Sequence, residues 1–123
     1  MGNLYNHLGL TDREVIQLWR DKNMPQRIVT GKTEPRHWKN YPNGTGVLVD
    51  VDTSDAHFAQ TPLYFTSIAG ISHHWATAGA TSIYDATPTG FRIYVRWAEG
   101  DPLTVDDAVA HGWYINWMAI ETT

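Results

Sequence analysis

The alternation of apolar residues after residue 46 restricts the fold of this chain more than any other feature. In residues 47–52 every second residue is valine, and in residues 90–97 the apolar side chains of Phe91, Ile93 and Val95 alternate with polar ones. A period of two places successive side chains on opposite faces of an extended strand. Both segments are therefore predicted to be β-strands with one buried face.

Other short segments have the composition of strands. Residues 62–68 are rich in Tyr, Phe, Thr and Ile, and residues 113–120 are apolar on both faces. A weaker strand is expected at 80–84, and a capped helical turn at 103–108. Short strands separated by Gly, Pro and Thr turns, with no long helices between them, predict an antiparallel sandwich or barrel.

A helix is predicted before these strands. Residues 11–14 read Thr-Asp-Arg-Glu, a capping-box pattern that starts a helix over residues 12–22. Its apolar stripe of Val15, Leu18 and Trp19 is narrow, and so short a helix is not stable alone. We expect the helix to dock, on the base of the sandwich or against other subunits.

The segment 26–46 holds several prolines and glycines, so we expect an extended connector with at most one short strand, near residues 27–30. This gives an N-terminal helix and connector, or neck, at 1–44 and a β-domain at 45–123.

Composition excludes several classes of protein. The 123 residues suit one domain, and the absence of cysteine excludes disulfides, thiolate metal sites and cysteine catalysis. No apolar run approaches the roughly 20 residues that span a bilayer, so we expect no membrane insertion. The net charge is −4, and after residue 39 the only Lys or Arg residues are Arg92 and Arg96. We therefore expect no nucleic-acid partner.

The second half of the chain carries a family-like series of motifs. Phe58 precedes Thr-Pro-Leu-Tyr-Phe-Thr-Ser-Ile at 61–68, followed by Thr-Pro-Thr-Gly-Phe-Arg-Ile-Tyr at 87–94, Trp-Ala-Glu at 97–99 and Asn-Trp-Met-Ala-Ile at 116–120. This order resembles the H-type lectin domain of snail agglutinins and of the discoidin C-terminal region. The resemblance covers about half of the chain.

The resemblance implies a fold and an activity. Members of that family are six-stranded antiparallel sandwiches that assemble as homotrimers and bind galactose-type sugars near subunit contacts. We therefore expect an all-β fold, a small antiparallel β-sandwich of about six strands with an N-terminal α-helix. The helical turn inserted at 100–112 and the segment 71–75 depart from the family pattern. The arrangement of helix, connector and small sandwich also resembles receptor-binding tips of bacterial or phage fibres.

Six residues are candidates for contact with a ligand. Trp75 lies in a loop-like segment, where its indole could stack on a galactose ring or be buried at a subunit contact. The histidines beside it could supply neutral donors and acceptors, and Arg96 belongs to a polar strip with Arg92 and Tyr94 that suits either sugar hydroxyls or an interface. The resemblance adds the Trp-x-acid element. The candidate ligand-binding residues are His73, His74, Trp75, Arg96, Trp97 and Glu99.

Three tryptophans, Trp97, Trp113 and Trp117, follow the alternation of their strands. We expect at least two of them to pack in the core.

Metal binding and catalysis are weaker interpretations. Asp50, Asp52 and Asp55 could offer carboxylates to calcium, but a solvated strand face explains them better. The sequence Ser-His-His at 72–74 could suggest a metal site or a nucleophile. Neighbouring strand histidines point to opposite faces, and the sequence offers no third ligand and no nucleophile elbow. We expect no metal, no cofactor and no enzymatic activity. A hydrolase ranks third among the hypotheses for function.

These observations predict a carbohydrate-binding adhesin or fibre-tip module that recognises galactose-type or other surface glycans as a homotrimer. Such a module would be extracellular, on a cell surface or on a virion appendage. The alternative is a trimerisation or capping module of a fibre that has no ligand of its own.

Overall fold

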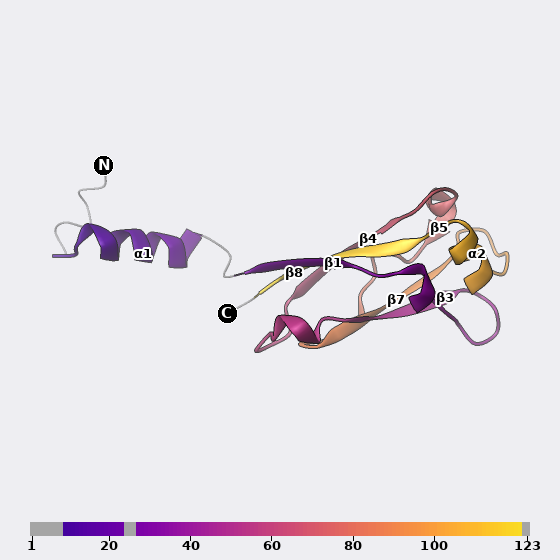
Figure 1. Cartoon of the computed structure of the whole chain (residues 1–123), viewed down its shortest axis with the longest axis horizontal. Coiled ribbons are helices and arrows are strands. Elements are labelled where there is room, and N and C mark those ends of the chain that lie inside the picture. The colour runs from indigo at the N-terminus through magenta and orange to yellow at the C-terminus, as the bar shows by residue number, and fades with distance from the viewer. Residues whose placement is uncertain (1–8, 24–26, 122–123) are drawn as a thin grey trace.

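The computed structural model describes residues 9–23 and 27–121. Within them the chain forms eight β-strands in two antiparallel sheets, together with two α-helices and three short 3-10 turns (Figure 1). The expected all-β, sandwich-like fold is confirmed.

The first sheet has three strands in the order β1-β8-β4. Its central strand β8 (Tyr114–Ile120) pairs on one side with β1 (Ile28–Lys32) and on the other with β4 (Leu63–Ala69). The predicted strands at 62–68, 113–120 and 27–30 are therefore present, with ends shifted by one or two residues.

The second sheet is built around β7 (Gly90–Trp97), which pairs along its length with β3 (Val47–Asp52). The two-residue strand β2 (Lys39–Asn40) extends the sheet beyond β3. On its other edge β7 pairs first with β6 (Tyr84–Thr87) and then with β5 (Thr77–Ala78). This edge of β7 therefore meets two separate short strands.

The core lies between the two sheets and follows the period-two patterns in the sequence. The valines of β3 and the apolar side chains Phe91, Ile93 and Val95 of β7 are buried, and they face Ile115 and Ala119 of β8. The tryptophan prediction is confirmed, because Trp113 is fully buried while Trp97 and Trp117 pack against the core in part.

Two expectations about strands were wrong. The strand expected at 80–84 is absent, because the chain turns there: Gly79 has a φ of +102° and its carbonyl accepts a hydrogen bond from the amide of Ser82. The connector contains two strands instead of one. Asn43 and Gly44 both have positive φ, which closes a tight hairpin between β2 and β3. The segment expected to be a neck therefore contributes one strand to each sheet, β1 to the first and β2 to the second.

Helix α1 (Asp12–Asn23) begins where the capping box predicted, since the Glu14 amide donates to the Thr11 hydroxyl at 3.2 Å. The described part of α1 makes no extended contact with either sheet, and it lies beyond the end of the sandwich at which β1 begins (Figure 1). Ile16 and Leu18 are about half exposed. The side chain of Trp19, which we expected to dock, lies outside the described residues.

Helix α2 (Val105–Ala110) corresponds to the helical turn predicted at 103–108. Thr104 caps it, and the Val105 amide donates to the side-chain oxygen of Asn40 at 2.8 Å. Leu103 and Ala108 are fully buried, so the segment that departs from the family pattern is anchored on the core.

Candidate functional site

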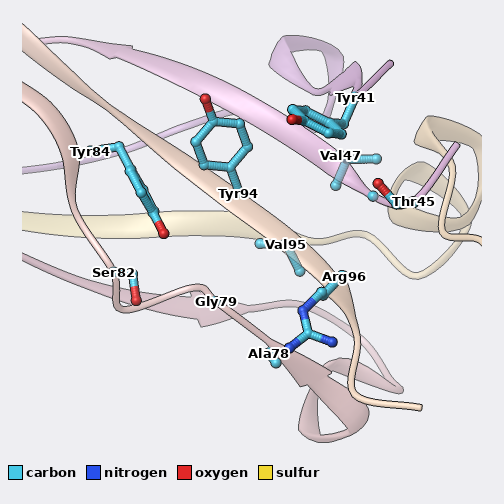
Figure 2. A pocket seen from close by; sticks show the side chains of 11 residues that line it. Tyr41, Thr45, Val47, Ala78, Gly79, Ser82, Tyr84, Tyr94, Val95 and Arg96 are labelled. Carbon is cyan, nitrogen blue, oxygen red and sulfur yellow. The ribbon is translucent and has the colours of Figure 1, made fainter. Parts of the chain in front are cut away.

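A cleft of about 420 Å³ opens on the outer face of the five-stranded sheet. Strand β7 forms its floor through Tyr94, Val95 and Arg96. The β2–β3 hairpin supplies one wall, and the segment from β5 to the start of β6 supplies the other (Figure 2). We call this site the tyrosine cleft, after Tyr41 and Tyr84 in its walls and Tyr94 on its floor.

The three tyrosine rings hold one another in place. Tyr94 lies between the other two, edge to face with Tyr41 at 5.5 Å between ring centroids and with Tyr84 at 4.9 Å (Figure 2). Edge-to-face pairs are a favoured geometry for aromatic rings. Tyr41 is nevertheless 41% exposed and Tyr84 49% exposed. The cleft therefore presents aromatic surface that is both ordered and open to solvent.

Two glycines let both walls approach the floor. A Cβ atom at Gly46 would clash with the Val95 carbonyl oxygen, and one at Gly79 would clash with the carbonyl oxygen of Tyr94. Gly79 also needs a positive φ, which L residues with a side chain rarely adopt. Glycine is thus required at both places where a wall meets β7.

The polar groups of the cleft are of two kinds. The hydroxyls of Thr45 and Ser82 line it and, among the described residues, bond to no other group. The Tyr94 hydroxyl accepts a hydrogen bond from Arg92 at 3.3 Å. Arg92 in turn donates two bonds to Asp50, at 2.6 and 3.0 Å, which hold the pKa of that carboxyl below its ordinary value. A neutralised ion pair thus borders the cleft.

Arg96 is the charged residue of the lining, and none of the lining residues is acidic. Its side chain is exposed and forms no ion pair with the described residues. In Figure 2 its guanidinium lies beside Ala78, the residue with which Arg96 pairs between β5 and β7. As expected, Arg92, Tyr94 and Arg96 share the outer face of β7.

The candidate residues in the loop 71–76 lie close to the end of β7. Thr77 pairs with Trp97, and the Ala98 amide donates to the Ala76 carbonyl at 2.9 Å. The indole of Trp75 is 88% exposed. Glu99 is exposed in the bend after β7. The loop therefore folds beside the Trp-x-acid element.

Apart from Trp75, the aromatic side chains at this end serve mainly as packing. The Trp97 ring contacts Trp113 edge to face at 5.3 Å, and the His73 ring lies over His111 at 4.3 Å. The Nδ1 atom of His74 is buried and has no partner among the described residues. Because Arg96 and Trp97 are successive strand residues, they face opposite sides of the sheet. Of the six candidate residues, Arg96 is the one that lines the tyrosine cleft.

The arrangement around Ser72 offers two of the three parts of a hydrolytic site. Its hydroxyl lies 3.2 Å from Nδ1 of His111, on the loop that follows α2. No carboxylate contacts the His111 ring in the described part of the chain, and Trp113 stacks on that ring. The pair lacks the orienting acid that a Ser-His-Asp triad has.

The three aspartates considered for calcium do not gather into a site. Both oxygens of Asp50 bind Arg92, and the Oδ1 atom of Asp52 accepts from the Ser54 amide at 2.9 Å. The side chain of Ser54 and then its amide hold the pKa of Asp52 below its ordinary value. Across residues 9–23 and 27–121, no three His, Asp or Glu side chains stand close enough to hold a metal ion.

In comparisons with known proteins, the chain matches no family model and no curated protein. In the described residues, neither helix has the length and apolar character needed to cross a membrane.

Tyr41, Thr45, Ser82 and Tyr84 are cleft residues that sequence reasoning missed. Tyr41 lies between Asn40 and Pro42, in a segment expected to be a connector. Tyr84 is the last residue of the segment 80–84, which was wrongly expected to be a strand. The signal that could have found Tyr41 is the Asn43-Gly44 dipeptide, which is typical of a hairpin and would have placed Tyr41 next to the strand at 47–52.

Proposed function

We propose that this chain is a carbohydrate-binding module and that the tyrosine cleft holds the sugar. The observation that carries the proposal is the set of three interlocked tyrosine rings, two of them about half exposed, over a cleft of about 420 Å³. An aromatic ring can stack on the apolar face of a pyranose. The hydroxyls of Thr45 and Ser82 can exchange their water for sugar hydroxyls.

The shape of the cleft supports a small ligand rather than a protein partner. Ligand sites are concave, mostly apolar and equipped with a few placed polar groups. The tyrosine cleft matches this description, because Ala78 and the three tyrosines line it beside Thr45 and Ser82. The glycan class we propose is galactose-type or another surface glycan. The module would act in an adhesin or fibre tip outside the cell, as a homotrimer.

A pair of variants tests this proposal and compares the two candidate regions. Tyr84→Ala removes a half-exposed ring from the cleft, and Trp75→Ala removes an 88% exposed ring from the loop at the end of β7. On a glycan array, binding should be lost in Tyr84→Ala and kept in Trp75→Ala, with melting temperatures checked for both. Loss only in Trp75→Ala would move the site to the loop, and a wild-type chain that binds no glycan would refute the proposal.

A second candidate function is the trimerisation or capping module. It is favoured by the uncovered outer face of the three-stranded sheet. Ile28, Leu63 and Phe65 are each about half exposed there. The register aligns them in two rows across the strands, Ile28-Ile120-Leu63 and Thr30-Met118-Phe65. Contiguous exposed apolar side chains mark interaction sites.

Light scattering tests the assembly. We expect the mass of a trimer at micromolar concentration. Phe65→Ser should give a lower mass, because the Phe65 side chain is half exposed on the outer face and is not part of the buried core. A wild-type monomer would remove the trimer from both candidate functions. A trimer that binds no glycan would favour the second function over the first.

A further inference from the structure

Arg96 gives the tyrosine cleft a single uncompensated positive charge. We infer that the sugar bound there is monoanionic, carrying a carboxylate or a sulfate ester that the Arg96 guanidinium receives. This inference rests on the proposed function, and it adds the chemical class of the ligand.

The other arginines of the sandwich show how unusual Arg96 is. Four arginines lie between residues 27 and 96. Arg27 pairs with Glu121, Arg36 with Glu34, and Arg92 with Asp50. The guanidinium of Arg96 has no carboxylate partner among the described residues, although the chain as a whole holds more acidic than basic residues and has a net charge of −4. An acidic partner was therefore available in the composition but is not placed beside Arg96.

The lining of the cleft strengthens this contrast. Apart from Arg96 its residues are Tyr41, Thr45, Gly46, Val47, Ala78, Gly79, Ser82, Tyr84, Tyr94 and Val95, none of which is charged at neutral pH. The nearby Arg92 is already neutralised by Asp50. One unpaired guanidinium in an otherwise neutral cleft matches one negative charge on a ligand.

The spacing along β7 suits a single sugar unit. Tyr94 and Arg96 are two residues apart and on the same face, so their Cα atoms are separated by about 7 Å. A pyranose that stacks in the tyrosine cluster can thus direct an anionic substituent toward Arg96. The planar fork of donors on arginine binds two oxygens of a carboxylate or sulfate at once, which lysine cannot do.

The test compares neutral and anionic sugars that share a ring configuration. Methyl galactoside, methyl galacturonoside and methyl galactoside 6-sulfate are titrated into the full chain, with a parallel series of glucosides, and binding is followed by NMR shift changes. We expect the wild-type chain to bind an anionic member about tenfold more tightly than its neutral counterpart, the size of one charge-assisted contact. The two anionic arms show whether the carboxylate or the sulfate is preferred.

Arg96→Gln should abolish this preference, so that neutral and anionic sugars bind this variant with equal affinity, whereas Arg96→Lys should keep part of it. The matched control is Arg36→Gln, which removes the same charge from an exposed side chain outside the cleft and should keep the full preference. Melting temperatures verify that each variant folds. If Arg96→Gln does not fold, the wild-type preference is measured at rising salt concentration, and the preference should decrease as the charge is screened.

The outcomes separate the two proposals. Equal affinity for neutral and anionic sugars, or a preference that survives in Arg96→Gln or at high salt, overturns the monoanionic ligand and leaves the carbohydrate-binding function standing. If no member of either series binds to the wild-type chain, the proposed function itself fails.

Discussion

Near the end of β7, aromatic side chains have opposite roles on the outer and inner faces of the sheet. On the outer face, Tyr94 contacts Tyr41 and Tyr84 edge to face and leaves their rings about half exposed. On the inner face, Trp97 contacts the fully buried Trp113. Aromatic content alone therefore does not locate a binding site. The distinguishing property is an exposed ring that other groups hold in place.

The largest expected effect comes from the packed region. Trp113 is fully buried, its indole N–H donates to the Ser72 carbonyl at 2.7 Å, and its own carbonyl accepts from the Trp38 indole at 2.9 Å. Trp113→Ala should lower the free energy of unfolding by about 3–5 kcal/mol, because it leaves a cavity and an unpaired carbonyl. Denaturant titration measures this. Trp75→Ala, at an 88% exposed site, should change it by less than about 0.5 kcal/mol.

An intermediate effect is expected where the cleft wall meets its floor. Gly79→Ala adds a Cβ that clashes with the Tyr94 carbonyl at a positive φ, and it should destabilise the fold by about 1–3 kcal/mol and weaken sugar binding. Gly100→Ala is the matched control, since Gly100 also has a positive φ but has open space around it. Equal losses of stability in the two variants would show that backbone conformation, and not the close approach to β7, makes glycine necessary at position 79.

The smallest effect concerns the ion pair beside the cleft. The hydrogen bonds from Arg92 hold the pKa of Asp50 below its ordinary value, so this carboxylate stabilises the fold above its unfolded-state pKa. The stabilisation is lost as the pH falls through the lower pKa of the folded state. Asp50→Asn should therefore cost stability at neutral pH, by at most about 1 kcal/mol for a pair this exposed, and nothing in strongly acidic solution. A loss of stability that persists in acid would assign another role to Asp50.

The elements that sequence reasoning found are those whose pattern is local. The valines at 47–52 and the alternation of Phe91, Ile93 and Val95 define their strands without reference to the rest of the chain. The Thr-Asp-Arg-Glu box likewise defines the start of α1. The burial of Trp113 follows from its place at the end of an apolar strand.

The cleft was not predictable in the same way, because it depends on which strands are neighbours. Tyr41 and Tyr84 are separated by more than forty residues, and both contact Tyr94 because β3 and β6 pair with opposite edges of β7. Arg96 was selected correctly as a residue of the outer face, but the sequence offered no means of seeing that it lacks an acidic partner. Pairing across sheets and the absence of a contact are both non-local properties.

The pairing of β1 with β8 also determines how the sandwich can be joined to other polypeptide. Ile28 lies opposite Ile120, Arg27 bonds to Glu121 across the same end, and the Glu121 amide donates to the Arg27 carbonyl at 2.9 Å. The polypeptide thus enters and leaves the sandwich at adjacent points, while β5, which pairs with Arg96, is at the far end (Figure 1). Such a unit can be inserted into a surface loop of a carrier protein through joints at Arg27 and Glu121, and the β5 end of its cleft then lies on the side remote from the carrier.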